Sequence, residues 1–418
     1  MKILLLSDIP PCKDYTAGLV LDQLCRFLPR GSIACFCVSV PELKAKISAD
    51  LEWIPTQYRN RPIEAVPPFK SYSLSKSYSL SKSYSLVHWL LNFGLHYYNG
   101  IALRRLVSQA VEYGRRFGAD VLWCPLEGET QIRLALPVAH SLGIPLLTEV
   151  YDPPTWMLRG NSTPSSLQAQ ILKMFSKVMS SSRVCATASW PMAREYHERF
   201  HVNTVSFLPS LHSSLAIDPA DRMNPGNELV IGLAGQMYAT EEWKALLRAL
   251  DTVGWRLGKR NVRIRLLGRW PMLTSTTPLR LEWLGWHTQQ NTVKLLSETD
   301  ILYCPYWFDS VFETEARLSF PSKLTTYFAA GRPVLFHGPQ YAAPAIFIKD
   351  NAAGLICDSN EESKILQALN TLASDEKLYG QLTHNGRAAF DKYLTLDSLR
   401  TSFAQFLQVE ENYLIPVT

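Results

Sequence analysis

The chain has 418 residues, and 42 Lys and Arg against 37 Asp and Glu give it a formal net charge of +5. A hydrophobic share of 47% and a charged share of 19% exclude a disordered chain and indicate an ordinary folded protein. The charge is mild and no dense basic run occurs, so nucleic acid is not an expected partner. The length exceeds one ordinary core and predicts two domains of roughly 200 residues each.

The apolar and cysteine patterns bear on where the protein works. The opening "MKILLLSD" is too short for a signal peptide, and Asp8 ends it, so it predicts a first buried strand. The most apolar long stretch, 87–106, contains two arginines and several other polar residues and is not expected to span a membrane. Eight cysteines without a CxxC pair fit a reducing compartment. We therefore expect a cytoplasmic protein.

Strands and helices alternate along the first half of the chain. Predicted strands lie at 2–8, 33–40, 120–126, 145–152 and 182–189, and predicted helices at 18–28, 132–143 and 192–200. Apolar strands that alternate with amphipathic helices predict a parallel sheet covered on both faces.

The same alternation begins again in the second half, with predicted strands at 228–235, 263–269, 281–286, 300–307, 332–338 and 353–359. Pro, Ser, Asn and Gly gather between Pro209 and Gly226, which indicates the joint between two doubly wound α/β domains. We predict an N-terminal domain over 1–212, a C-terminal domain over 213–395, and a helix within 396–418 that packs back toward the N-terminal domain.

A short repeat interrupts the first domain. The sequence "SYSLSK" occurs at 71–76 and 77–82, and "SYSL" follows at 83–86, so we expect a low-complexity loop over 71–86. An inert loop and a loop that meets an acceptor or a lipid headgroup both remain open. The aromatic-rich helix expected after it is interpreted as a core helix, with peripheral contact at the inner face of a membrane as the alternative.

The segment "FPSKLTTYFAAGRPVLF", residues 320–336, predicts a short helix followed by a buried strand. Leu324, Tyr327 and Phe328 give the helix one apolar face, and Gly331 stands where a left-handed cap is expected. Free backbone N–H groups, a positive helix end and Lys323 together suit an anion, most often a phosphate. A helix cap beside a solvated lysine is the alternative.

Several motifs follow one another between Glu228 and Tyr393. They are "VIGLAGQMYATEEWKALLRAL", "IRLLGR", "LEWLGW", "LLSETDILYCPYW", the segment over 320–336, "NAAGLICDSNEESKILQAL" and "NGRAAFDKYL". In order and spacing they resemble the retaining GT-B glycosyltransferases called family 4. The first domain is similar to the family's acceptor domain through "PPCKDYTAGLVLDQLCRFL", "LTEVYD" and "MAREYHERF". The resemblance implies two Rossmann-like domains that face each other across a cleft.

The resemblance also implies an activity, which is transfer of a sugar, of hexosyltransferase type, from a nucleoside diphosphate to a hydroxyl. A helix end at Pro321, Ser322 and Lys323 would face the diphosphate, and Lys323 would stabilise the charge that develops on the leaving phosphate. A UDP- or GDP-sugar is then the co-substrate, with no cofactor and no metal. The acceptor is a saccharide, a lipid-linked intermediate or a small molecule.

The chain departs from the family pattern at several phosphate and ribose positions. Gly235 and Gln236 stand where the family has Gly-Arg, and Thr326 stands where it has the glutamate that holds the ribose. The lost cations could be replaced by an arginine at 269, 317 or 332.

Two residues of the first domain are candidates through the same resemblance. Gly18 lies in a segment similar to the loop that closes near the sugar diphosphate, and it either allows close backbone approach or only begins a helix. Asp152 follows a strand and either orients a sugar hydroxyl or caps a turn. A non-catalytic subunit that binds glycan or a partner, and a GT-B epimerase, stay open as alternative functions.

Overall fold

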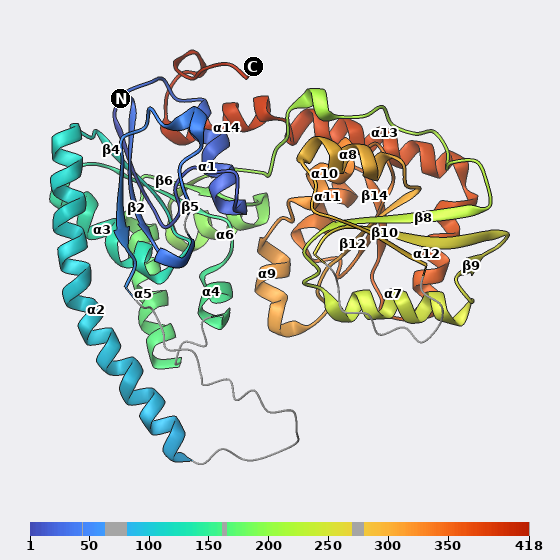
Figure 1. Cartoon of the computed structure of the whole chain (residues 1–418), viewed down its shortest axis with the longest axis horizontal. Coiled ribbons are helices and arrows are strands. Elements are labelled where there is room, and N and C mark those ends of the chain that lie inside the picture. Colours follow the sequence, from blue (N-terminus) through green and yellow to red (C-terminus); the bar gives the residue numbers. More distant parts are fainter. Residues whose placement is uncertain (44, 63–81, 161–164, 270–279, 418) are drawn as a thin grey trace. The chain divides into compact units, whose positions relative to one another are not determined.

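The structure is a computed structural model that describes residues 1–43, 45–62, 82–160, 165–269 and 280–417. The chain forms two compact units. Unit 1 combines Met1–Phe207 with Arg400–Pro416, and unit 2 is Leu208–Leu399. Each unit is an α/β structure built on one main sheet (Figure 1).

Unit 1 contains a parallel sheet of seven strands in the order β3-β2-β1-β4-β5-β6-β7. The strands are β1 (Ile3–Ser7), β2 (Ile33–Ser39), β3 (Thr56–Asn60), β4 (Val121–Pro125), β5 (Leu146–Val150), β6 (Val184–Thr187) and β7 (Asn203–Ser206). The helices are α1 (Thr16–Arg26), α2 (Lys82–Phe117), α3 (Glu129–Leu142), α4 (Pro154–Gly160), α5 (Ser165–Ser181), α6 (Trp190–Phe200) and most of α14 (Leu396–Leu407).

Side chains of alternate residues cover the two faces of this sheet. Leu4 of β1 faces α2, because a Cβ built on Gly114 would lie 3.0 Å from the Leu4 side chain. Trp123 of β4 packs against α14, with its ring centroid 5.4 Å from that of Phe403. Phe27, directly after α1, also contacts Phe403, so α1 and α14 share one face of the sheet.

Unit 2 contains a second sheet, in the order β11-β10-β8-β12-β13-β14, with β9 beside β10. The strands are β8 (Glu228–Gly235), β9 (Arg256–Leu257), β10 (Arg260–Gly268), β11 (Leu281–Gly285), β12 (Ile301–Pro305), β13 (Val334–His337) and β14 (Gly354–Cys357). The helices are α7 (Thr240–Thr252), α8 (Gln289–Ser297), α9 (Glu313–Leu318), α10 (Lys323–Ala329), α11 (Ala343–Asp350), α12 (Glu362–Ser374) and α13 (Glu376–Tyr393).

Two apolar clusters fill the two sides of the second sheet. One cluster joins α8, α10, α11 and α13 to the sheet through residues such as Leu302 and Phe328. The other joins α7 and α12 to the opposite face through residues such as Trp243 and Leu369. Successive residues of β12, such as Leu302 and Tyr303, enter opposite clusters, so this central strand is buried on both faces.

The boundary expected for the low-complexity loop is partly wrong. Helix α2 begins at Lys82 and therefore includes residues 82–86, which the repeat had assigned to the loop. No Gly or Pro interrupts these residues, so they extend the helix that follows. The rest of the repeat lies outside the described residues. No helix in the described ranges is long and apolar enough to cross a membrane.

Candidate functional site

The order of strands in unit 2 predicts where a ligand binds. From β8 the chain moves outward to β10 and β11, and it then returns to the other side of β8 to form β12, β13 and β14. In open α/β sheets, ligands bind outside the carboxyl ends of the strands at such a reversal. Here the reversal lies between β8, which ends at Gly235, and β12, which ends at Pro305.

Helix α10 is held over this reversal by a tyrosine. The Tyr327 hydroxyl accepts a hydrogen bond from the Ala234 amide of β8 at 2.9 Å, and it donates to the Tyr303 carbonyl of β12 at 3.2 Å. Lys323 precedes Tyr327 by four residues, so the two side chains lie on the same side of the helix. The anchor at Tyr327 thereby directs Lys323 to the end of β8.

Lys323 is buried at that position. Its ammonium Nζ donates to the Gln236 carbonyl at 3.1 Å and lies 4.4 Å from the centroid of the Tyr238 ring. Only 8% of the residue is exposed, so the alternative of a solvated lysine is wrong. Ser322 has helical backbone angles and its side chain makes no capping hydrogen bond, so the alternative of a serine cap is not realised either.

The ammonium of Lys323 has no carboxylate partner among the described residues. Burial lowers the pKa of Lys323 from its ordinary value, because desolvation disfavours the charged form. An ammonium group has three donors, and the Gln236 carbonyl takes one of them. A buried cation in this state is costly unless an anion joins it. An anion beside this ammonium would offset that cost.

Glycines bring the ends of β8 and β10 close together. Gly268 pairs with Gly235 in the parallel register, and both have positive φ angles, 107° and 88°. A Cβ on Gly268 would lie 2.9 Å from the Gly235 carbonyl oxygen, which excludes any side chain there. The exposed Arg269 and Gln236 each directly follow one glycine of this pair.

The three arginines that could replace the lost cations differ in their surroundings. Arg332 is bound within the fold, since its guanidinium donates to the Ser297 carbonyl at 2.6 Å and to the Asn224 side chain at 3.1 Å. Arg317 lies on α9 and is half-buried. Of the three, only Arg269 directly follows a strand that neighbours β8.

The remaining predicted residues of unit 2 are placed as follows. Pro321 is buried immediately before α10, and Thr326 is half-buried on that helix. The neighbouring Thr325 donates to the Pro209 carbonyl at 2.6 Å and so has a structural role. The Glu242 carboxylate of α7 accepts a hydrogen bond from the Phe308 amide at 2.9 Å. It fixes a loop that follows β12.

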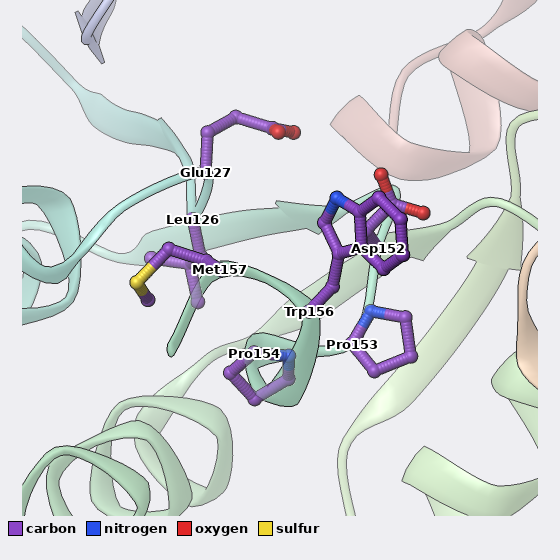
Figure 2. A pocket seen from close by; sticks show the side chains of 7 residues that line it. All are labelled: Leu126, Glu127, Asp152, Pro153, Pro154, Trp156 and Met157. Atoms are coloured by element: carbon purple, nitrogen blue, oxygen red, sulfur yellow. The ribbon is translucent and has the colours of Figure 1, made fainter. Parts of the chain in front are cut away.

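Unit 1 has a reversal of the same kind, between β1 and β4. Glu127 follows β4, and Asp152 follows the next strand, β5. Both side chains line one pocket of unit 1 (Figure 2). Sequence reasoning found Asp152 and missed Glu127, although both are carboxylates just beyond a buried strand.

Gly18 has a packing role inside unit 1. It lies in the first turn of α1, and a Cβ there would be 2.4 Å from the Cys12 sulfur. The Gly18 carbonyl also accepts a hydrogen bond from the Cys12 amide at 3.0 Å. The close approach at this glycine is therefore made by the preceding segment of the same chain.

Comparison with known proteins places the second unit in a family. Residues 228–375 match the family model described as glycosyl transferases group 1. Unit 2 is therefore similar to the glycosyl transferases of group 1. The matched residues include the strands and helices that surround Lys323, and the match confirms the predicted resemblance at the level of group 1 glycosyltransferases. No curated protein sequence matched the chain.

Solved structures similar to this glycosyltransferase share its fold over nearly the whole chain. Anabaena HepE in complex with UDP has a TM-score of 0.64 at 13% identity, with 98% of this chain and 100% of that chain covered. Sucrose-phosphate synthase from Thermosynechococcus elongatus has a TM-score of 0.66 at 11% identity, with 98% of each chain covered. The trehalose 6-phosphate synthase of Burkholderia multivorans has a TM-score of 0.60 at 12% identity, with 97% and 98% covered. The predicted GT-B fold is confirmed.

Proposed function

We propose that this protein transfers a hexose from a UDP-linked donor to a hydroxyl group, with retention at the anomeric carbon and without a divalent metal. The family match over 228–375 supports sugar transfer. The structures of HepE with UDP and with UDP-glucose support the choice of donor. The observation that carries the proposal is the buried Lys323, which has no carboxylate partner in the described part of the chain and lies at the reversal of the second sheet.

The chemistry assigned to Lys323 is stabilisation of the leaving group. In the reaction, the bond between the anomeric carbon and a diphosphate oxygen breaks, and its electron pair leaves with UDP. The acceptor oxygen forms the new bond from the same side and passes its proton to the departing phosphate oxygen. Within the described residues the Gln236 carbonyl takes one donor of Lys323, so the other two suit the growing phosphate charge, and burial strengthens this interaction.

Arg269 is proposed as the second phosphate-binding cation. The family pattern has an arginine where this chain has Gln236, and Gln236 and Arg269 directly follow the last paired residues of β8 and β10. Two cations can neutralise a diphosphate without a metal, and residues 213–395 contain no Asp-x-Asp sequence. Gly235, Gln236, Pro321, Ser322 and Thr326 complete the proposed nucleotide site.

The place of action is proposed as the cytoplasm, with the nucleotide sugar drawn from solution. Eight cysteines are free and buried, as expected for a chain that folds under reducing conditions. Peripheral contact with a membrane remains part of the proposal for a lipid-linked acceptor.

A thermal-shift experiment tests the nucleotide site. A ligand that binds only the folded protein raises the melting temperature. UDP, GDP and ADP, with their glucose conjugates, are compared on the parent, Lys323→Met and Lys364→Met. Lys364 is an exposed lysine on α12 and serves as the matched control. We expect UDP to stabilise the parent and the control, and Lys323→Met to lose about 1–3 kcal/mol of UDP binding.

The outcomes separate the proposed function from its alternatives. Equal UDP affinity in Lys323→Met and the parent would remove the proposed role of Lys323. UDP-glucose binding without turnover on any acceptor would favour a binding subunit. Epimerised donor in the absence of an acceptor would favour an epimerase. Analysis of the product by NMR decides retention, since the anomeric configuration is read from the coupling of the anomeric proton.

A further inference from the structure

The short segment between β8 and α7, residues 236–239, supplies two contacts to the Lys323 ammonium. The Gln236 carbonyl accepts a hydrogen bond from Nζ at 3.1 Å, and Nζ lies over the face of the Tyr238 ring, 4.4 Å from its centroid. A cation within about 6 Å of an aromatic centroid is attracted by the negative face of the ring. This attraction is larger when the cation is desolvated, and Lys323 is buried.

The Tyr238 ring is held in place by other aromatic side chains. Its centroid lies 4.8 Å from that of Trp307 and 6.0 Å from that of Tyr306. The Trp307 indole also donates a hydrogen bond to the Tyr238 carbonyl at 3.1 Å. Phe312 stacks on Trp307, with ring centroids 5.2 Å apart. Packing of this kind fixes the orientation of a side chain that supports a site, so the ring stays beside Lys323.

An aromatic ring differs from a carboxylate in what it leaves to a ligand. A carboxylate beside Lys323 would cancel the charge of the ammonium and would repel a phosphate. A ring attracts the cation through its quadrupole and carries no net charge. The Tyr238 ring therefore stabilises the charged form of Lys323 without reducing the attraction of that charge for a phosphate.

The titratable neighbours of Lys323 in the described residues do not neutralise its ammonium at pH 7. They are Cys304 on β12, Tyr238, and Tyr327 one turn further along α10. Burial raises the pKa of Cys304 to about 12 and that of Tyr327 well above its ordinary value, so both stay uncharged. Desolvation lowers the pKa of Lys323 itself. The Gln236 carbonyl and the face of the Tyr238 ring are contacts that oppose this effect.

We propose that Tyr238 is a positioning residue of the donor site, and that its ring holds the Lys323 ammonium charged and in place at the end of β8 before the donor binds. The inference rests on the proposed function, because the phosphate that Lys323 would meet is that of the nucleotide sugar. Tyr238 acts through Lys323 and needs no contact with the donor. Trp307 acts one step further out, since it fixes the ring.

Titration of Lys323 in the full chain, without any ligand, tests the proposal. The lysines are labelled with ¹³C at Cε, the Lys323 signal is assigned by its loss in Lys323→Met, and its chemical shift is followed with pH. Tyr238→Leu should lower the pKa of Lys323 by about one unit, whereas Tyr238→Phe keeps the ring and should leave it unchanged. Tyr393→Leu is the control, because that ring on α13 lies under the exposed Lys392, and it should not affect Lys323.

A fluorinated ring distinguishes the effect on charge from an effect on packing. Trifluorophenylalanine at position 238 keeps the ring and nearly its size, but fluorine withdraws electron density and weakens the attraction for a cation. The pKa of Lys323 should fall by about half a unit or more relative to Tyr238→Phe. An unchanged pKa with the fluorinated ring would overturn the proposal whatever Tyr238→Leu shows, because packing would then explain the effect of leucine. An equal fall in Tyr238→Phe and Tyr238→Leu would also overturn it.

UDP binding to the same variants separates this proposal from the proposed function. Calorimetry is repeated across the alkaline range, and the decline in UDP affinity should begin about one pH unit lower in Tyr238→Leu than in the parent. Absence of UDP binding by the parent refutes the proposed function, while the titration of Lys323 still decides whether Tyr238 holds its charge. UDP binding with the same alkaline decline in the parent and Tyr238→Leu refutes the role of Tyr238 and leaves the proposed function in place.

Discussion

Replacement of Glu149 by glutamine should make the protein more stable at neutral and alkaline pH. Glu149 lies on β5, is 1% exposed, and accepts a hydrogen bond from the Trp123 indole at 2.8 Å. Burial raises the pKa of its carboxyl from 4.5 to about 7. In the unfolded chain the same group ionises near its ordinary value.

The sign of the effect follows from proton binding. Between pH 4.5 and about 7 the folded protein holds a proton that the unfolded chain has released, so its free energy of unfolding falls as pH rises. A pKa difference of about 2.5 corresponds to about 3 kcal/mol at roughly 1.4 kcal/mol per pH unit. Glutamine does not titrate, and its amide oxygen can still accept from the Trp123 indole. Relative to the parent, the free energy of unfolding of Glu149→Gln should therefore rise by about 3 kcal/mol as the pH increases from 4.5 to 8.

Hydrogen exchange of peptides from β4 and β5 provides the measurement. Parent and variant are compared at each pH, so that intrinsic exchange rates cancel. The matched control is Glu112→Gln on α2, where the side chain is 70% exposed, and its difference from the parent should stay flat. A pH-independent difference for Glu149→Gln would show that this carboxyl keeps one ionisation state throughout the range, and the reasoning from burial would be refuted.

Three other predictions concern unit 2. Turnover should survive complete removal of divalent metals, and a loss restored by magnesium or manganese would contradict the proposed role of Lys323. UDP affinity, measured by calorimetry, should fall at alkaline pH as Lys323 loses its proton. Because burial lowers the pKa of Lys323, the decline should begin at a lower pH than for an ordinary lysine. The Lys323→Met variant should show no such decline. Gly331→Ala should cost about 2–4 kcal/mol in urea unfolding, since alanine is strained at φ 65° and its Cβ would lie 2.7 Å from the Asp218 carbonyl oxygen. A loss below about 0.5 kcal/mol would show that the Asp218 segment moves away freely.

The central strands could be predicted from the sequence because they are buried on both faces. Continuous apolar runs such as Leu4 to Leu6 and Leu302 to Cys304 leave a clear pattern. The edge strands β3 and β7 were missed, since their residues are polar and mostly half-exposed or exposed, and no apolar run marks them. Gly331 was predicted correctly as a left-handed cap, because its conformation depends on a local stop signal.

The candidate site was less accessible to sequence reasoning. The segment at 320–336 indicated Lys323, but its burial depends on Tyr238 and Gln236, more than eighty residues away in the sequence. The hydrogen bond from Arg332 to Asn224 also joins residues that lie far apart in the sequence, so no local pattern predicts it. Glu127 carried a usable signal, since a carboxylate that directly follows a buried central strand lies at the edge where ligands bind.

The route of the chain through unit 1 affects how the protein can fold during synthesis. Residues 400–416 belong to the unit that begins at Met1, and the whole of unit 2 is made between its two parts. Phe403 and Phe406 pack on Phe207, with ring centroids 6.0 Å and 5.1 Å apart, and both also contact Trp123. Trp123 and Phe207 therefore lack these two aromatic partners until α14 leaves the ribosome.

At a synthesis rate of about 5–20 residues per second, the 192 residues from Leu208 to Leu399 take roughly 10–40 seconds to make. During that time the nascent first unit presents Trp123 and Phe207 without their aromatic cover. Unit 2, which is continuous in sequence, can complete its own core first. Unit 1 is thus the unit that finishes folding last. A chaperone that binds exposed aromatic side chains would bind unit 1 during synthesis.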